Sequence, residues 1–179
     1  MTLASIANIF GVLALVKGCA LLSKPNYVRH MAHAFPRNRA VAYILTIVDI
    51  VWIMLIMLHA DLGRFEHLKP YLYIAAPVAI LLIAIYIDEL LAPRAVGGFL
   101  LLLADPVLDA ARWHDSSWSM LMSFLVYLWI IYAMLLILSP YRYRQAVAFW
   151  VRDNARMRLG GIIATLFGIV FLVLGITVY

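Results

Sequence analysis

Long apolar runs dominate this chain of 179 residues and constrain its fold more than any other feature. Five runs are clear, over residues 3–22, 40–58, 71–87, 117–138 and 159–178. A sixth, 95–113, is less uniform because Asp105, Pro106, Asp109 and Arg112 interrupt its second half. A helix needs roughly 20 apolar residues to cross the hydrocarbon core of a bilayer. The sequence therefore predicts an all-α, polytopic membrane bundle.

The composition excludes the other broad classes of protein. Hydrophobic residues make up 66% of the chain and charged residues 13%, whereas a soluble domain is about half apolar and a quarter charged. A single cysteine, Cys19, excludes a disulfide scaffold. The chain has no phosphate-binding loop, serine-hydrolase elbow, zinc-protease motif or paired-cysteine motif. We therefore expect no enzymatic activity, no metal site and no resident cofactor.

The distribution of positive charge predicts how many of the runs cross the membrane. Cytoplasmic loops carry an excess of Lys and Arg. Two long loops, 23–39 and 139–158, are strongly basic, and they lie on the same side only if 95–113 also crosses. With six crossings, ten Lys and Arg residues lie in inner loops and three in outer loops. We therefore predict six transmembrane segments with both termini outside, in a membrane such as the bacterial inner membrane.

The six segments can be grouped into three hairpins, 3–58, 71–113 and 117–178, within a single membrane domain. The two basic loops match at an offset of 115 residues, where Pro25, Arg29, Arg37, Asn38 and Ala40 correspond to Pro140, Arg144, Arg152, Asp153 and Ala155. One interpretation is internal duplication, as in many membrane folds. The other is that inner loops share these residues for topological reasons alone.

Small residues form a stripe with a seven-residue period on the first and the last helix. The first places Ala4, Gly11 and Gly18 in register, and the last places Gly161, Gly168 and Gly175 in register. Such stripes let membrane helices approach closely. Gly11, Gly18, Gly161, Gly168 and Gly175 are therefore candidates for docking onto a partner subunit. The alternative is packing within the chain.

The basic loops are candidates for contact with anionic lipid or with an acidic partner surface, and no nucleic acid is implied. In 140–158, aromatic residues alternate with arginines, which is typical of a helix lying in the membrane interface. The alternative is an ordinary solvated loop. A bound phospholipid is expected, and a quinone is a possible ligand that no motif supports. The arginines concerned are Arg29, Arg37, Arg39, Arg142, Arg144, Arg152, Arg156 and Arg158.

Ionisable groups within apolar runs are costly and often functional, and three such residues, Lys17, Asp49 and Asp105, are candidates for an ion or proton path. Asp49 falls near the middle of the second run, and Lys17 is its nearest candidate partner. A structural pair and a role in proton or ion movement are both open for Asp49. Asp105 and Pro106 predict a break in a short fourth segment, because Asp is favoured at a helix N-cap and Pro at the next position. The broken segment could also expose a site for an ion.

Two functions follow from these features. The first is a non-catalytic membrane subunit of a larger complex, which docks through the glycine-striped helices and the basic inner loops. The second is a small, oligomeric, proton- or ion-coupled transporter or channel that uses Asp49 and Asp105.

Overall fold

The computed structural model describes residues 2–86, 91–113 and 118–178, and the regular structure over these residues is entirely helical. Six helical spans are long and apolar enough to cross a membrane, which confirms a polytopic helical bundle. They comprise α1 (Leu3–Ser23), α3 (Arg39–His59), α4 (Lys69–Tyr86) preceded by the 3-10 helix η2 (Gly63–Leu68), α5 (Leu91–Arg112), α6 (Ser119–Leu138) and α8 (Asn154–Thr177).

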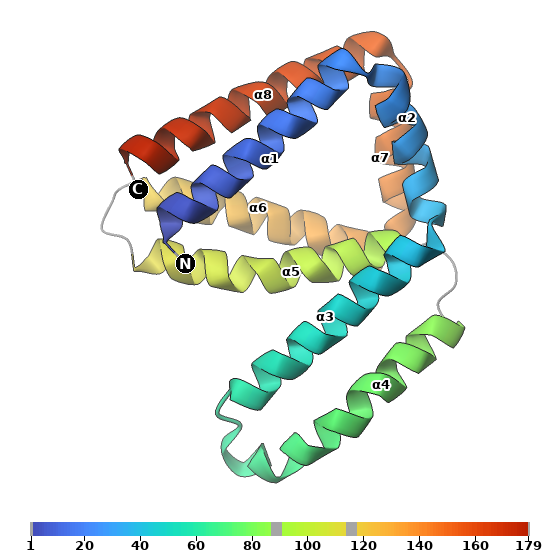
Figure 1. Cartoon of the computed structure of the whole chain (residues 1–179), viewed down its shortest axis with the longest axis vertical. Helices are drawn as coiled ribbons and strands as arrows, with labels where there is room; N and C mark the ends of the chain where they lie inside the picture. Colours follow the sequence, from blue (N-terminus) through green and yellow to red (C-terminus); the bar gives the residue numbers. More distant parts are fainter. Residues whose placement is uncertain (1, 87–90, 114–117, 179) are drawn as a thin grey trace.

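The two basic loops are themselves helical. The first forms α2 (Pro25–Ala34) and the short 3-10 helix η1 (Phe35–Arg37), and the second forms α7 (Pro140–Val151). Figure 1 shows α2 and α7 side by side across one end of the bundle, which we call the basic end. The prediction of a helix in the second loop is confirmed.

Proline sets the boundary between the apolar and the basic helices in both halves of the chain. The residue before a proline is driven out of the α-helical conformation. Lys24 accordingly has φ −133 and ψ 61, and Ser139 has φ −136 and ψ 66. The proline that follows each is well suited to the first position of a new helix. The two basic segments therefore share a local structure, whereas their common origin stays a prediction.

The helices do not pair as the three predicted hairpins would require. The closest pairs are α1 with α8, α5 with α6, and α3 with α5, and α4 packs less extensively on α3 (Figure 1). The connection between α3 and α4, over residues 60–62, lies at the end opposite the basic end (Figure 1). The helices that pack together are therefore not the ones that the predicted hairpins join. The helix α2 separates α1 from α3, and the helix α7 separates α6 from α8.

The glycine stripes meet each other in the seam between α1 and α8. The register places Ala4 opposite Gly175, Gly11 opposite Gly168, and Gly18 opposite Gly161. A Cβ atom at Gly168 would lie 2.8 Å from the Leu15 nitrogen and 2.9 Å from the Gly11 carbonyl oxygen. Only hydrogen fits between backbones at this separation, so the stripes allow the two helices to come into contact.

The prediction that these glycines dock a partner subunit is therefore wrong, and the alternative of packing within the chain holds. All five glycines of the two stripes are buried in the α1–α8 seam. A surface that the chain's own helix already covers is closed to a second protein. The seam brings the first and last helices together and leaves both ends of the chain opposite the basic end (Figure 1).

The α1–α8 pair meets the α5–α6 pair far from the basic end. Buried residues from the start of α1, the second half of α5 and the start of α6 form the core there, comprising Leu3, Ile6, Ala7, Ala104, Val107, Ala111, Met122 and Val126. The Trp129 indole donates a hydrogen bond to the Leu100 carbonyl oxygen at 2.8 Å, which joins α6 to α5.

This core also explains why α5 is not broken or short, as the sequence had suggested. The helix runs without interruption for 22 residues, with Pro106 inside it. A proline removes one backbone hydrogen bond, a loss that membrane helices tolerate when neighbouring helices support them. Ala104 lies before the proline and Val107 after it, and both are buried in the same core. Packing therefore holds the two halves of α5 in line.

We predict that Gly168→Ala lowers the free energy of unfolding in detergent by roughly 1–3 kcal/mol, the usual cost of overpacking. The new methyl group would collide with backbone atoms of α1 that cannot move without shifting the helix. The matched control is Gly160→Ala in the same helix, where a Cβ atom would lie 3.5 Å from the Trp150 ring, at ordinary contact distance. Equal effects of the two substitutions would contradict the proposed seam.

Candidate functional site

The basic end carries most of the predicted binding residues, and the structure divides them into two groups. Some arginines are used to hold the fold together, whereas others remain exposed. Arg142, Arg144, Arg152 and Arg158 are exposed, as is Arg39 at the start of α3. The side chain of Arg37 lies outside the part of the chain that the structure describes.

Arg29 joins α2 to the start of α8. Its Nη2 donates a hydrogen bond to the Asn154 Oδ1 at 2.8 Å and contacts the Met157 Sδ at 3.9 Å. Its Nε is buried and has no hydrogen-bond partner among the described residues. Arg29 is therefore a structural residue of the basic end, and only part of its hydrogen-bonding capacity is used.

Arg156 closes the turn between α7 and α8. Its Nη1 donates to the Phe149 carbonyl oxygen at 3.2 Å, and its guanidinium carbon lies 4.2 Å from the centre of the Phe149 ring. The planar guanidinium stacks well on aromatic rings, so one side chain satisfies a helix-terminal carbonyl and covers an apolar surface. Arg156 is thus partly engaged within the chain as well.

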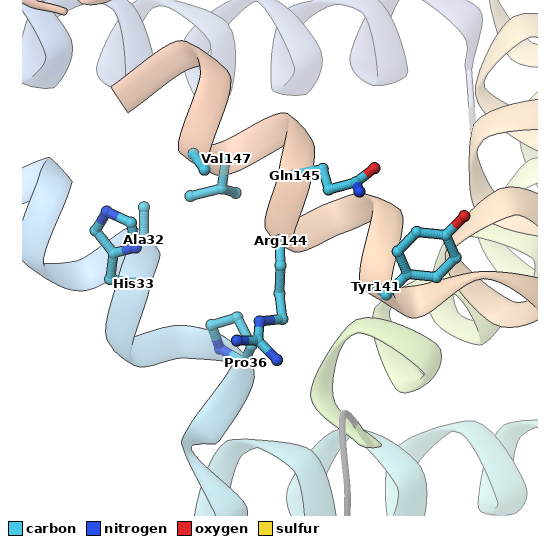
Figure 2. Close-up of a pocket in the computed structure, with 8 residues that line it drawn as sticks. Ala32, His33, Pro36, Tyr141, Arg144, Gln145 and Val147 are labelled. Atoms are coloured by element: carbon cyan, nitrogen blue, oxygen red, sulfur yellow. The ribbon is translucent and has the colours of Figure 1, made fainter. Parts of the chain in front are cut away.

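A cavity of about 540 Å³ lies between α2 with η1 on one side and α7 on the other, and we call it the α2–α7 pocket (Figure 2). Its lining residues are Ala32, His33, Pro36, Tyr141, Arg144, Gln145, Val147 and Ala148. Figure 2 shows the Arg144 side chain extending from α7 toward Pro36, with His33 on the facing helix. Sequence analysis singled out Arg144 as a binding residue but did not place His33 or Gln145 beside it, because only the pairing of α2 with α7 brings these residues together.

A tilted aromatic pair joins η1 to α7, next in the chain to the pocket-lining residues Pro36 and Arg144. The Phe35 and Tyr143 rings lie 5.9 Å apart between centres. Burial raises the pKa of the Tyr143 phenol above its ordinary value of 10.0, and Tyr132 raises that pKa further. The phenol therefore stays neutral at physiological pH, and the pair adds an uncharged contact between η1 and α7.

The second candidate site is a buried carboxylate in the seam between α3 and α5. Asp49 is only 7% exposed, and its Oδ1 has no hydrogen-bond partner within the described residues. A Cβ atom at Gly98 would lie 2.9 Å from the Asp49 Oδ2, so a larger residue there would displace the carboxylate. Thr46, one turn earlier on α3, is also buried, and its hydroxyl donates to the Ala42 carbonyl oxygen.

The double glycine of α5 thus serves two neighbouring helices. Gly98 makes room for Asp49 of α3, whereas a Cβ atom at Gly97 would lie 2.8 Å from the Ala133 carbonyl oxygen of α6. Arg94 lies one turn before Gly98, and its Nε is likewise buried without a hydrogen-bond partner among the described residues. The Asp49 Oδ1 and the Arg94 Nε are therefore two buried atoms of α3 and α5 with unused hydrogen-bonding capacity.

The structure does not bring Lys17, Asp49 and Asp105 together. Lys17 is exposed on α1, whereas the helices that pack on α3 are α4 and α5. Asp105 is exposed on α5, two turns beyond Gly98. The predicted pairing of Lys17 with Asp49 is therefore wrong. An ion path through Asp49 and Asp105 would have to join a buried group to a distant exposed one.

No group of three or more potential metal ligands gathers within residues 2–86, 91–113 and 118–178. Comparisons with protein-family models, with curated proteins and with solved structures found no match to this chain. The functional argument therefore depends on the geometry of the chain itself.

We predict that Arg29 and Asn154 are coupled in stability. Hydrogen bonds to charged groups contribute about 1.5–3 kcal/mol when well shielded, and solvent exposure reduces this. A double-mutant cycle of Arg29→Gln and Asn154→Ala, read from unfolding in detergent, should give a coupling energy of about 1 kcal/mol. A parallel cycle with Arg142→Gln should give none. Equal coupling in the two cycles would show that general charge, and not this contact, accounts for the effect.

Proposed function

We propose that this chain is a non-catalytic integral membrane subunit of a larger membrane complex, which it joins through α4 and the basic end. The observation that carries the proposal is the isolation of α4. Among the described elements, α3 is the only transmembrane helix that packs closely on α4, and no residue of the span Gly63–Ile83 is buried. The helix α4 also lies on the far side of α3 from the other four membrane helices (Figure 1).

Isolation matters because lipid supplies no hydrophobic force that drives helices together. Membrane helices associate through close packing and polar contacts. A helix with a single neighbour has few such contacts of its own, so a partner helix would supply what the chain does not. Among the exposed large side chains of α4, five follow the spacing of a helix–helix seam, and Tyr73 and Leu82 are exposed beside them; the five are Tyr71, Ile74, Val78, Leu81 and Ile85.

The basic end would contribute the second contact of the proposed subunit. The positive-inside rule favours a cytoplasmic location for this end. Four exposed arginines within residues 140–158 lie there and could face an acidic surface of a partner or anionic headgroups. The glycine stripes have no part in docking, because the α1–α8 seam buries them.

We predict that a photo-crosslinking residue at Ile74 or Leu81 captures a different protein in native membranes, at the same mass shift for both positions. The control is Ile169 on α8, which is 48% exposed on an apolar face of a helix that already has a close partner. It should yield no protein adduct. Absence of adducts at both α4 positions would overturn docking through α4. An adduct between two copies of this chain would favour the homo-oligomer of the second candidate.

The buried carboxylate favours one second candidate, a small proton- or ion-coupled transporter. An ionisable side chain near the bilayer centre costs about 2.5–3.5 kcal/mol on insertion scales, so its retention calls for a compensating role. Asp49 has an unpartnered oxygen in a seam that Gly98 keeps open. Asp105 no longer supports this candidate, because it is exposed on an unbroken helix.

This second candidate predicts that Asp49→Asn abolishes proton- or cation-dependent flux in proteoliposomes while the thermal midpoint in detergent does not fall. The amide has nearly the shape of the carboxyl group, so packing beside Gly98 is retained. Asp105→Asn is the matched control and should leave flux unchanged. Wild-type flux no greater than that of empty liposomes would eliminate the candidate and leave Asp49 a structural role.

A further inference from the structure

We propose that the α2–α7 pocket binds the phosphate of one anionic phospholipid headgroup at the basic end. This inference is independent of the proposed function, because a lipid would occupy the pocket whether or not a partner subunit is bound. It also narrows the general expectation of lipid contact along the basic loops to one site with a defined anion-binding residue.

The lining of the pocket combines apolar and hydrogen-bonding side chains, which match the apolar and polar parts of a phospholipid. Ala32, Pro36 and Val147 supply an apolar wall, whereas His33, Arg144 and Gln145 supply hydrogen-bond donors. No acidic residue is among the lining side chains, so the pocket favours an anion. Its volume of about 540 Å³ lies within the range of roughly 300–1,000 Å³ typical of small-molecule sites.

Arg144 is the residue that distinguishes this pocket from the rest of the basic end. Arg29 and Arg156 donate hydrogen bonds within the chain. Among the described residues, no hydrogen bond or ion pair engages the exposed side chain of Arg144, which extends into the pocket (Figure 2). A guanidinium presents paired donors that match two oxygens of a phosphate. The geometry thus offers an unused phosphate-binding group in a preformed cavity.

The depth of the pocket favours a lipid as the source of the phosphate. The helix α7 begins at Pro140, two residues after the membrane-spanning helix α6 ends at Leu138. The helix α2 likewise begins at Pro25, two residues after α1 ends at Ser23. Both walls of the pocket therefore start where the membrane spans end, at the level where headgroups lie. Tyrosine side chains are enriched at this level, and Tyr141 lines the pocket.

The test counts lipids bound to purified protein by native mass spectrometry after mild delipidation and addition of phosphatidylglycerol or phosphatidylcholine. We expect the wild-type chain to retain one phosphatidylglycerol with at least tenfold preference over phosphatidylcholine. Arg144→Gln should weaken retention about tenfold, whereas Arg142→Gln, which removes the same charge from the same helix outside the pocket, should leave it unchanged. Equal losses in the two variants would overturn the site in favour of general charge attraction.

Two further arms keep the outcome decisive. Ala148→Leu reduces the pocket while all charges remain, and it should also lower retention; unchanged retention would overturn the pocket as the binding site. Inorganic phosphate at millimolar concentration should not displace the lipid from the wild-type chain. Displacement that depends on Arg144 would identify a soluble phosphate compound as the ligand and overturn the assignment to a lipid.

Discussion

The close contact between α1 and α8 is the interaction on which the rest of the architecture depends. Glycine faces backbone along this seam, so the first and last membrane helices lie side by side. Because α1 and α8 lie side by side, the two helices that leave them at the basic end also start close together. The helix α2 leads from α1 to α3 and the helix α7 leads from α6 to α8, and the two pack against each other (Figure 1). The α2–α7 pocket is a consequence of this closure.

Glycine also makes room for a polar side chain inside the bundle, as it makes room for a neighbouring backbone in the α1–α8 seam. Gly97 and Gly98 let α5 contact α6 on one face and Asp49 of α3 on the other. Gly97 therefore allows the close packing of α5 on α6, the consecutive helices with the most extensive contact. Gly98 makes room for Asp49, the only buried carboxylate in the described part of the chain. An isolated carboxylate would be costly against lipid. Placing it opposite glycine, within reach of a helix that also carries Arg94, keeps it away from the acyl chains.

The sequence was sufficient to predict the helices but not their neighbours. Apolar length identifies a membrane span, and charge asymmetry counts the crossings, so all six spans were predicted. Pairing is different, because every lipid-facing surface is as apolar as every helix-facing one. The glycine stripes predicted close contact but could not say which chain supplies the second helix. The signal for α1–α8 pairing was present in the equal spacing of the two stripes.

The prediction of a break at Asp105 and Pro106 was wrong because a local capping preference is weaker than the packing of Ala104 and Val107 in the core. The pocket could not be predicted from the sequence, since His33 and Arg144 come from segments that meet only in the folded chain.

We propose that this chain has a supporting role in a larger assembly, and three features support the proposal: the closed α1–α8 seam, the sparsely packed helix α4 and the exposed arginines of the basic end. The most direct test is the mass of the intact particle released from native membranes, measured by native mass spectrometry with the tagged chain expressed at its natural level. The account predicts a particle that contains at least one different membrane protein in fixed stoichiometry with this chain. A particle that contains only this chain, as a monomer or a homo-oligomer, would contradict it.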